Sequence, residues 1–163
     1  IDLSQFDYVV DCIDTVSAKL ELIKRCHQLN IPIISCMGAA NKLDATGFKI
    51  ADINKTKMDS LAKVIRKKLK KLNIPKLKVV YSEEPPLTPI DDQDISCRFH
   101  CICPNKDMRK CTERRTIPAS NAWVPAAAGL IIGGEVVKDM INRAGTMRLQ
   151  DEDNIEDNEI THI

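Results

Sequence analysis

The chain has 163 residues, and its 24 Lys or Arg and 23 Asp or Glu residues give a formal net charge of +1. With 44% hydrophobic and 29% charged residues, it has the composition of a globular protein rather than a fibrous or disordered one. The length fits one domain with a substantial core, which must be aliphatic because only 4% of the residues are aromatic. No leader opens the chain, and its apolar stretch 122–134 is too short to cross a bilayer. We therefore expect a cytoplasmic protein that does not enter the membrane.

Alternating strand and helix patterns run through the first half of the chain. In chain order, strands are predicted at 6–13, 31–36, 48–53 and 77–81, and helices at 16–29, 60–72 and 123–141. The opening strand–helix–strand order is typical of a parallel crossover unit. The predicted fold class is therefore α/β, with the chain forming part of a doubly wound, Rossmann-like sheet.

The predicted organisation has four segments. They are an α/β part at 1–81 that includes a basic helix at 60–72, a Cys-rich loop at 82–119, an apolar packing helix at 120–143 and an acidic tail at 144–163. The tail holds six acids and no Lys or Arg between 151 and 163, so we expect it to be disordered. In the packing helix, Gly129 and Gly133 allow close approach of the sheet or of a second subunit.

Two aspartates stand where the first predicted strand ends. Parallel α/β sheets bind ligands at the carboxyl ends of their strands, and a carboxylate there can hold Mg²⁺ together with substrate phosphates. Asp11 and Asp14 occupy these positions, directly before the first helix. A purely structural role is the alternative, since Asp14 or Thr15 could instead cap that helix.

The same residues resemble the Asp-x-x-Asp motif of the ubiquitin-activating-type adenylating enzymes. The matching segments are Tyr8-Val9-Val10-Asp11-Cys12-Ile13-Asp14-Thr15, Ala18-Lys19, Ile31-Pro32-Ile33-Ile34-Ser35 and Gly38-Ala39. In that superfamily, the second aspartate of the motif helps to bind Mg-ATP and the acyl-adenylate, which implies this role for Asp14. The resemblance also places Asp11 and Thr15 at the nucleotide site, with shaping of the turn as the alternative role for Asp11.

Later segments resemble one branch of the superfamily, the tRNA threonylcarbamoyladenosine dehydratases. These segments are 38–44, 52–56, 59–70, 114–120 and 124–131. The resemblance implies an enzyme that uses ATP and Mg²⁺ to adenylate the carboxylate of threonylcarbamoyladenosine in tRNA and to cyclise it, and it implies a homodimer. The glycine-rich phosphate turn of the family does not occur in this sequence. We therefore expect the C-terminal half of such an enzyme, inactive by itself.

Two other functions fit parts of the sequence. The first is adenylation of a sulfur-carrier protein by a related enzyme, although the Cys-x-x-Cys zinc half-site of those enzymes is not found after the third predicted strand. The second is a non-catalytic RNA-binding module stabilised by zinc. A bound ubiquitin-like protein would favour the first function, and tRNA binding without ATP would favour the second.

A block of positive charge favours a nucleic-acid partner. Ten Lys or Arg residues and one acid fall between Lys55 and Lys78. Such a block suits tRNA phosphates, although a solvated helix face has the same pattern. The candidate tRNA ligands are Lys63, Arg66, Lys67, Lys70 and Lys71.

The Cys-rich loop carries a candidate metal site. Four thiolates can complete a tetrahedral Zn²⁺ site, and the candidate ligands are Cys97, Cys101, Cys103 and Cys111. A single reactive cysteine, activated by neighbouring basic residues, and a loop of ordinary thiols are the alternatives. The three other cysteines, Cys12, Cys26 and Cys36, fall in predicted core elements and are expected to pack there.

Overall fold

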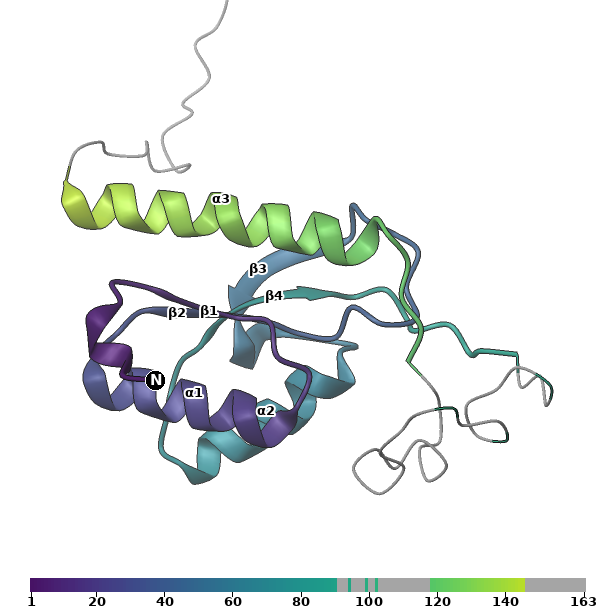
Figure 1. Cartoon of the computed structure of the whole chain (residues 1–163), viewed down its shortest axis with the longest axis horizontal. Helices are drawn as coiled ribbons and strands as arrows, with labels where there is room; N and C mark the ends of the chain where they lie inside the picture. Colours follow the sequence, from purple (N-terminus) through teal and green to yellow (C-terminus); the bar gives the residue numbers. More distant parts are fainter. Residues whose placement is uncertain (91–93, 95–98, 100–101, 103–117, 146–163) are drawn as a thin grey trace, which may run out of the picture.

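A four-stranded sheet lies between two helices on one face and a single long helix on the other (Figure 1). In this computed structural model, the described residues are 1–90, 94, 99, 102 and 118–145. The strands are β1 (Val9–Asp11), β2 (Ile33–Cys36), β3 (Phe48–Asp52) and β4 (Lys78–Ser82). The helices are α1 (Val16–Leu29), α2 (Ser60–Lys71) and α3 (Val124–Ala144), with short 3₁₀ turns η1 (Leu3–Gln5) and η2 (Ile53–Lys55). The α/β fold class is confirmed.

The strands lie in the order β1-β2-β4-β3. β1 pairs in parallel with β2, with Asp11 opposite Ser35, and β2 pairs in parallel with β4. The predicted crossover from β1 through α1 to β2 is therefore confirmed. β3 instead runs antiparallel to β4. The 37–47 connection to β3 contains no helix, and a chain that is to return parallel usually needs a helical crossover.

Side chains cap two of the helices. The Asp59 carboxylate accepts a 2.8 Å hydrogen bond from the backbone N–H of Ala62 and so caps α2. Asn121 Oδ1 accepts from the N–H of Val124 at the start of α3. Thr15 occupies the N-cap position of α1, as the sequence allowed, but its side chain makes no capping hydrogen bond. The first helix is therefore fixed by other contacts.

Two apolar clusters fill the layers on either side of the sheet. Ile23 of α1 and Ile65 of α2 are buried on one face, while Ala128 and Ile132 of α3 are buried on the other. Of the three cysteines expected in the core, Cys26 is fully buried and Cys36 is half-buried, but Cys12 is exposed. The prediction for Cys12 is wrong because β1 ends at Asp11, so that Cys12 already lies beyond the sheet.

The outer face of α3 is apolar and open. Leu130 is 79% exposed and Val137 is 56% exposed. A Cβ atom added at Gly129 or Gly133 would meet no atom within 4 Å, so these glycines do not serve close packing on the sheet. Contact with a second subunit, the other role that the sequence suggested for them, stays a prediction. Among the described helices, none is both long and apolar enough to cross a membrane.

Charged groups fasten the other side of α3 to the sheet. Lys78 Nζ of β4 lies 2.6 Å from Asp139 Oδ1 and 2.9 Å from Glu135 Oε1, and the Tyr8 hydroxyl donates to Asp139 Oδ2 at 2.7 Å. Partial burial raises the pKa of Asp139, but the hydrogen bonds from Lys78 and Tyr8 outweigh it and hold the pKa below 3.8. A carboxyl whose pKa is lower in the folded chain stabilises the fold above pH 3.8, and this contribution is lost as the pH falls through the folded value.

The Asp139→Asn variant tests this acid-sensitive contact. We expect it to unfold more easily at neutral pH by roughly 1 kcal/mol, since one hydrogen-bonded charge is removed. We also expect its free energy of unfolding to fall less steeply than that of the parent below pH 3.8. Urea titrations followed by circular dichroism at several pH values measure both effects. Asp7→Asn, at an exposed position, is the control, and an unchanged acid slope in Asp139→Asn would contradict the assignment.

Candidate functional site

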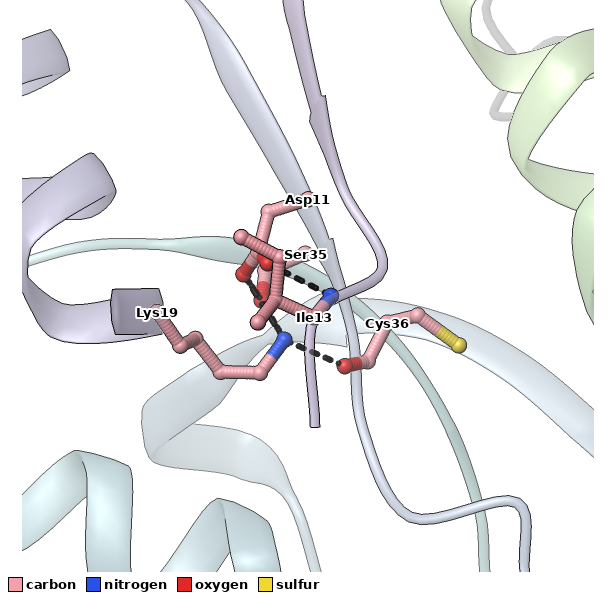
Figure 2. Close-up of polar contacts among 5 residues, drawn as sticks. All are labelled: Asp11, Ile13, Lys19, Ser35 and Cys36. Atoms are coloured by element: carbon pink, nitrogen blue, oxygen red, sulfur yellow. Dashed lines mark hydrogen bonds and ion pairs between the residues drawn. The ribbon is translucent and has the colours of Figure 1, made fainter. Parts of the chain in front are cut away.

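A buried ion pair lies beneath the carboxyl ends of β1 and β2 (Figure 2). Lys19 Nζ of α1 donates to Asp11 Oδ2 at 2.7 Å, to Ser35 Oγ at 3.1 Å and to the backbone carbonyl of Cys36 at 2.9 Å. The side chains of Lys19 and Asp11 are both 0% exposed. All three donors of the ammonium group are therefore used, as burial of a charge requires.

Asp11 is closed off from solvent by the same cluster. Its Oδ2 also accepts from Ser35 Oγ at 2.6 Å, and its Oδ1 accepts from the backbone N–H of Ile13 at 3.0 Å. The second of these bonds fixes the backbone immediately before Asp14. This placement supports the alternative that Asp11 shapes the turn, and it leaves Asp14 as the motif carboxylate that faces solvent.

Lys19 is the site-shaping residue that the sequence analysis missed. It is spaced from Ile23 and Cys26 at i, i+4 and i+7, which places it in the apolar stripe of α1, and all three are buried. A lysine at such a position needs a buried acidic partner. The signal was therefore present, but the partner Asp11 is only evident once β1 and α1 are packed together.

Asp14 lies at a cleft with a volume of about 370 Å³. The cleft is bounded by the ends of β1 and β2, residues 39–40 and 118–120, and the first turns of α3. Asp14 is exposed, and within the described part of the chain no hydrogen bond or ion pair engages its carboxylate. Thr15 is also exposed, but it does not line the cleft. An open carboxylate at the carboxyl edge of parallel strands suits a hard cation such as Mg²⁺.

The turn at 41–43 holds the chain segments that wall the cleft. Asn41 donates its backbone N–H to the carbonyl of Ala119 at 2.8 Å, and its Oδ1 accepts from the N–H of Ala119 at 2.7 Å. The Asn41 carbonyl accepts from the N–H of Leu87. Two further bonds join Asn121 Nδ2 to the carbonyl of Lys42 and Trp123 Nε1 to the carbonyl of Leu43. The two ends of the Cys-rich loop, near Leu87 and at Ala119, are thus tied to one turn.

Lys42 is a buried cation behind this turn. Its Nζ donates to the carbonyls of Ser82 at 3.0 Å and Glu84 at 2.8 Å, and the residue is 6% exposed. Burial lowers the pKa of Lys42, against the opposing effect of the Asp59 and Glu84 carboxylates. Lys42 therefore anchors the end of β4 rather than offering its charge to a ligand.

The basic residues of α2 lie away from the cleft, on a helix that covers the opposite face of the sheet from α3 (Figure 1). Four of the five candidates are exposed, namely Lys63, Lys67, Lys70 and Lys71. Arg66 is half-buried, and its Nη1 donates to the carbonyl of Ile53 at 3.0 Å and to Thr56 Oγ1 at 2.7 Å. One end of the Arg66 guanidinium is therefore committed to holding η2. A groove of about 680 Å³ runs beside it, lined by Lys67 and Lys70 among others.

The candidate zinc ligands Cys97, Cys101, Cys103 and Cys111 lie outside the described residues. Within the described part of the chain, no three His, Cys, Asp or Glu side chains are grouped so that they could hold a metal ion. Zinc binding in the Cys-rich loop and magnesium binding at Asp14 both stay predictions.

Curated relatives identify the branch of enzymes to which the sequence is similar. No protein-family model matches the chain. A protein of Bacillus subtilis named tRNA threonylcarbamoyladenosine dehydratase is 43% identical over 146 residues, which are 89% of this chain and 55% of the relative. The chain is homologous to the tRNA threonylcarbamoyladenosine dehydratases. The dehydratase 2 of Saccharomyces cerevisiae is 39% identical over 95 residues, 54% of this chain and 21% of the relative.

Solved structures confirm the Rossmann-like fold. The E. coli dehydratase TcdA in complex with AMP matches with a TM-score of 0.67 and 24% identity, covering 88% of this chain and 52% of that one. A structure named TcdA (CsdL) matches with a TM-score of 0.66 and 25% identity, covering 88% and 51%. The chain thus spans about half the length of its dehydratase relative in B. subtilis and of these structures. These relatives do not favour the sulfur-carrier and zinc-module alternatives.

The Lys19→Met variant tests the buried ion pair. We expect it to lose about 3–5 kcal/mol of unfolding free energy, because Asp11 is left buried without its partner. Removing both charges together, in Asp11→Leu with Lys19→Met, is expected to recover a large part of that loss. Urea unfolding measures each value. Lys24→Met, on the same helix with a 45% exposed side chain, is the control, and equal losses in the two lysine variants would refute the role of Lys19.

Proposed function

We propose that the protein containing this chain is an ATP-dependent enzyme that modifies tRNA. It would activate the carboxylate of threonylcarbamoyladenosine by adenylation and close it into a ring, with loss of water overall. The homology to the B. subtilis dehydratase supports this reaction, and the structure of E. coli TcdA, which shares this fold, in complex with ATP supports the cofactor. The observation that carries the proposal in this chain is the position of Asp14, open to solvent at the carboxyl edge of β1.

The residues at this edge fit Mg-ATP. Bound ATP would supply an adenylyl group to one oxygen of the substrate carboxylate, so that AMP could leave when the ring closes. Asp14 would hold the magnesium ion, since its oxygens are hard ligands without a protein partner among the described residues. Asp11 and Lys19 would keep the turn that carries Asp14 and Thr15 in one conformation, because their contacts with β2 and with Ile13 are buried or half-buried.

The exposed lysines of α2 would bind the tRNA backbone. Lys63, Lys67, Lys70 and Lys71 each present a charge that can neutralise a phosphate, and Lys67 and Lys70 also line the groove beside η2. No aromatic residue occurs on α2 for stacking on bases. This surface would therefore position the tRNA without reading its sequence. Arg66 would hold η2 in place through its bonds to Ile53 and Thr56, and its other guanidinium N–H groups would donate to tRNA phosphates.

A homodimer in the cytoplasm completes the proposal. The open face of α3 carries Gly129, Leu130, Gly133 and Val137, and a second copy would remove this apolar surface from water. Glycines at i and i+4 let two helices approach closely.

The Asp14→Ala variant, made in the full-length protein that contains this chain, tests the assigned carboxylate. We expect ATP-dependent tRNA modification to fall by about 100-fold or more, the usual cost of removing one group that stabilises charge at a reaction centre. Mass spectrometry of the tRNA nucleosides measures the rate. Asp7→Ala is the control, because Asp7 is also exposed but precedes β1 at its opposite end. Turnover of Asp14→Ala at the parent rate would remove Asp14 from the mechanism.

Charge reversal on α2 tests the proposed tRNA surface. We expect Lys67→Glu with Lys70→Glu to weaken tRNA binding and to reduce the slope of log affinity against log salt by roughly 2, one for each lost phosphate contact. Filter binding over a range of salt concentrations measures the slope. The control is Lys24→Glu on α1, which also replaces a partly exposed lysine. If the slope of the double variant equals that of the control, the lysines of α2 are merely solvated.

A further inference from the structure

Two cysteines lie side by side at the carboxyl ends of β1 and β2. Cys12 directly follows Asp11, Cys36 directly follows Ser35, and Asp11 and Ser35 are partners in the parallel ladder. Neighbouring strands of a sheet lie about 4.8 Å apart. A disulfide needs a Cα–Cα distance of roughly 4.4–6.8 Å, so the register brings the two residues within bonding range.

The Cys36 thiol lies on the face of the sheet away from Lys19, where the cleft is. The side chains of Asp11 and Ser35 point towards Lys19, and successive side chains of a strand alternate between faces. Figure 2 shows the Cys36 sulfur directed away from Lys19, as this alternation requires. Cys12 and Cys36 both line the cleft that also contains Asp14 and residues of α3.

We propose that Cys12 and Cys36 are a modification site, at which a peroxide converts the two thiols into a reversible disulfide across the ends of β1 and β2. Both are free thiols in this structure, and Cys12 is exposed, so an oxidant reaches it from solvent. Cys26 is fully buried on α1 and is protected from the same reagent.

The reaction balances with hydrogen peroxide as the oxidant. The Cys12 thiolate attacks one peroxide oxygen, the O–O bond breaks, and hydroxide leaves, which gives a sulfenic acid at Cys12. The Cys36 sulfur then attacks the Cys12 sulfur, the S–O bond breaks, and the oxygen leaves as water after taking up the Cys36 proton. Two electrons pass from the thiols to the peroxide, and a dithiol reductant returns them.

The bond would alter the turn that carries Asp14. Cys12 lies two residues before Asp14. A cross-link from Cys12 to β2 would therefore restrict the backbone between Cys12 and Asp14. An effect on ATP binding rests on the function proposed above, whereas formation of the disulfide does not. We therefore expect the oxidised form of the full-length protein that contains this chain to bind ATP differently from the reduced form, and dithiothreitol to reverse the change.

Peptide mapping of the oxidised chain tests the disulfide without ATP. The chain is prepared with Cys97, Cys101, Cys103 and Cys111 replaced by Ser, oxidised with hydrogen peroxide, alkylated and digested. We expect a cross-linked peptide that lacks two hydrogens and disappears with dithiothreitol. Fragment ions assign the bond to Cys36 rather than to Cys26. The cross-link is expected to be absent from Cys12→Ser and from Cys36→Ser.

Three outcomes would overturn the proposal. They are oxidation of Cys12 to a sulfinic acid with no cross-link, a bond from Cys12 to Cys26, and a cross-link that survives in Cys36→Ser. If the variant with four serines does not fold, the same mapping is applied to the unaltered chain. A bond from Cys12 to one of the four loop cysteines, in place of Cys36, would then overturn it equally. A disulfide that leaves ATP binding unchanged would count against the function assigned to this edge and not against the modification site.

Discussion

The carboxyl edge of this sheet depends on one fully buried ammonium group. Lys19 Nζ is satisfied only when Asp11, Ser35 and the carbonyl of Cys36 are all in place, and these belong to β1 and β2 while Lys19 belongs to α1. Because an unpaired buried charge is far more costly than a paired one, the three elements meet in one arrangement. The fixed Asp11 carboxylate also accepts the hydrogen bond from the N–H of Ile13. The orientation of the turn that carries Asp14 therefore depends on the contact between Asp11 and Lys19, on the face of the sheet that α1 covers.

The cleft at Asp14 combines a rigid side with a side assembled from distant segments. The rigid side is the strand ends, held by the buried cluster of Lys19. The other side comes from residues 118–120 and α3, which reach the cleft because Asn41 bonds to Ala119 across 78 positions of sequence. The two sides are thus positioned by separate networks.

The sequence predicted the individual helices and strands well, but it predicted less well which strands and side chains contact one another in the fold. The limits of α1 and the presence of all four strands followed from apolar periodicity, because that signal is contained within each element. The antiparallel direction of β3 depends on its pairing with β4, which lies some 30 residues away, and the pattern does not encode it. The motif indicated an exposed Asp14, but the burial of Asp11 and the attachment of Arg66 to η2 follow from neighbours that sequence spacing does not reveal.

The two outer edges of the sheet differ in a way that bears on association. β3 forms one edge and carries Lys49, a charged side chain of the kind that discourages another strand from docking. β1 forms the other edge, where Val10 is 48% exposed and Phe6 nearby is 45% exposed. Of the two edges, β1 is therefore the one with less protection against the addition of another strand, and it is the edge at which a further strand would extend the sheet.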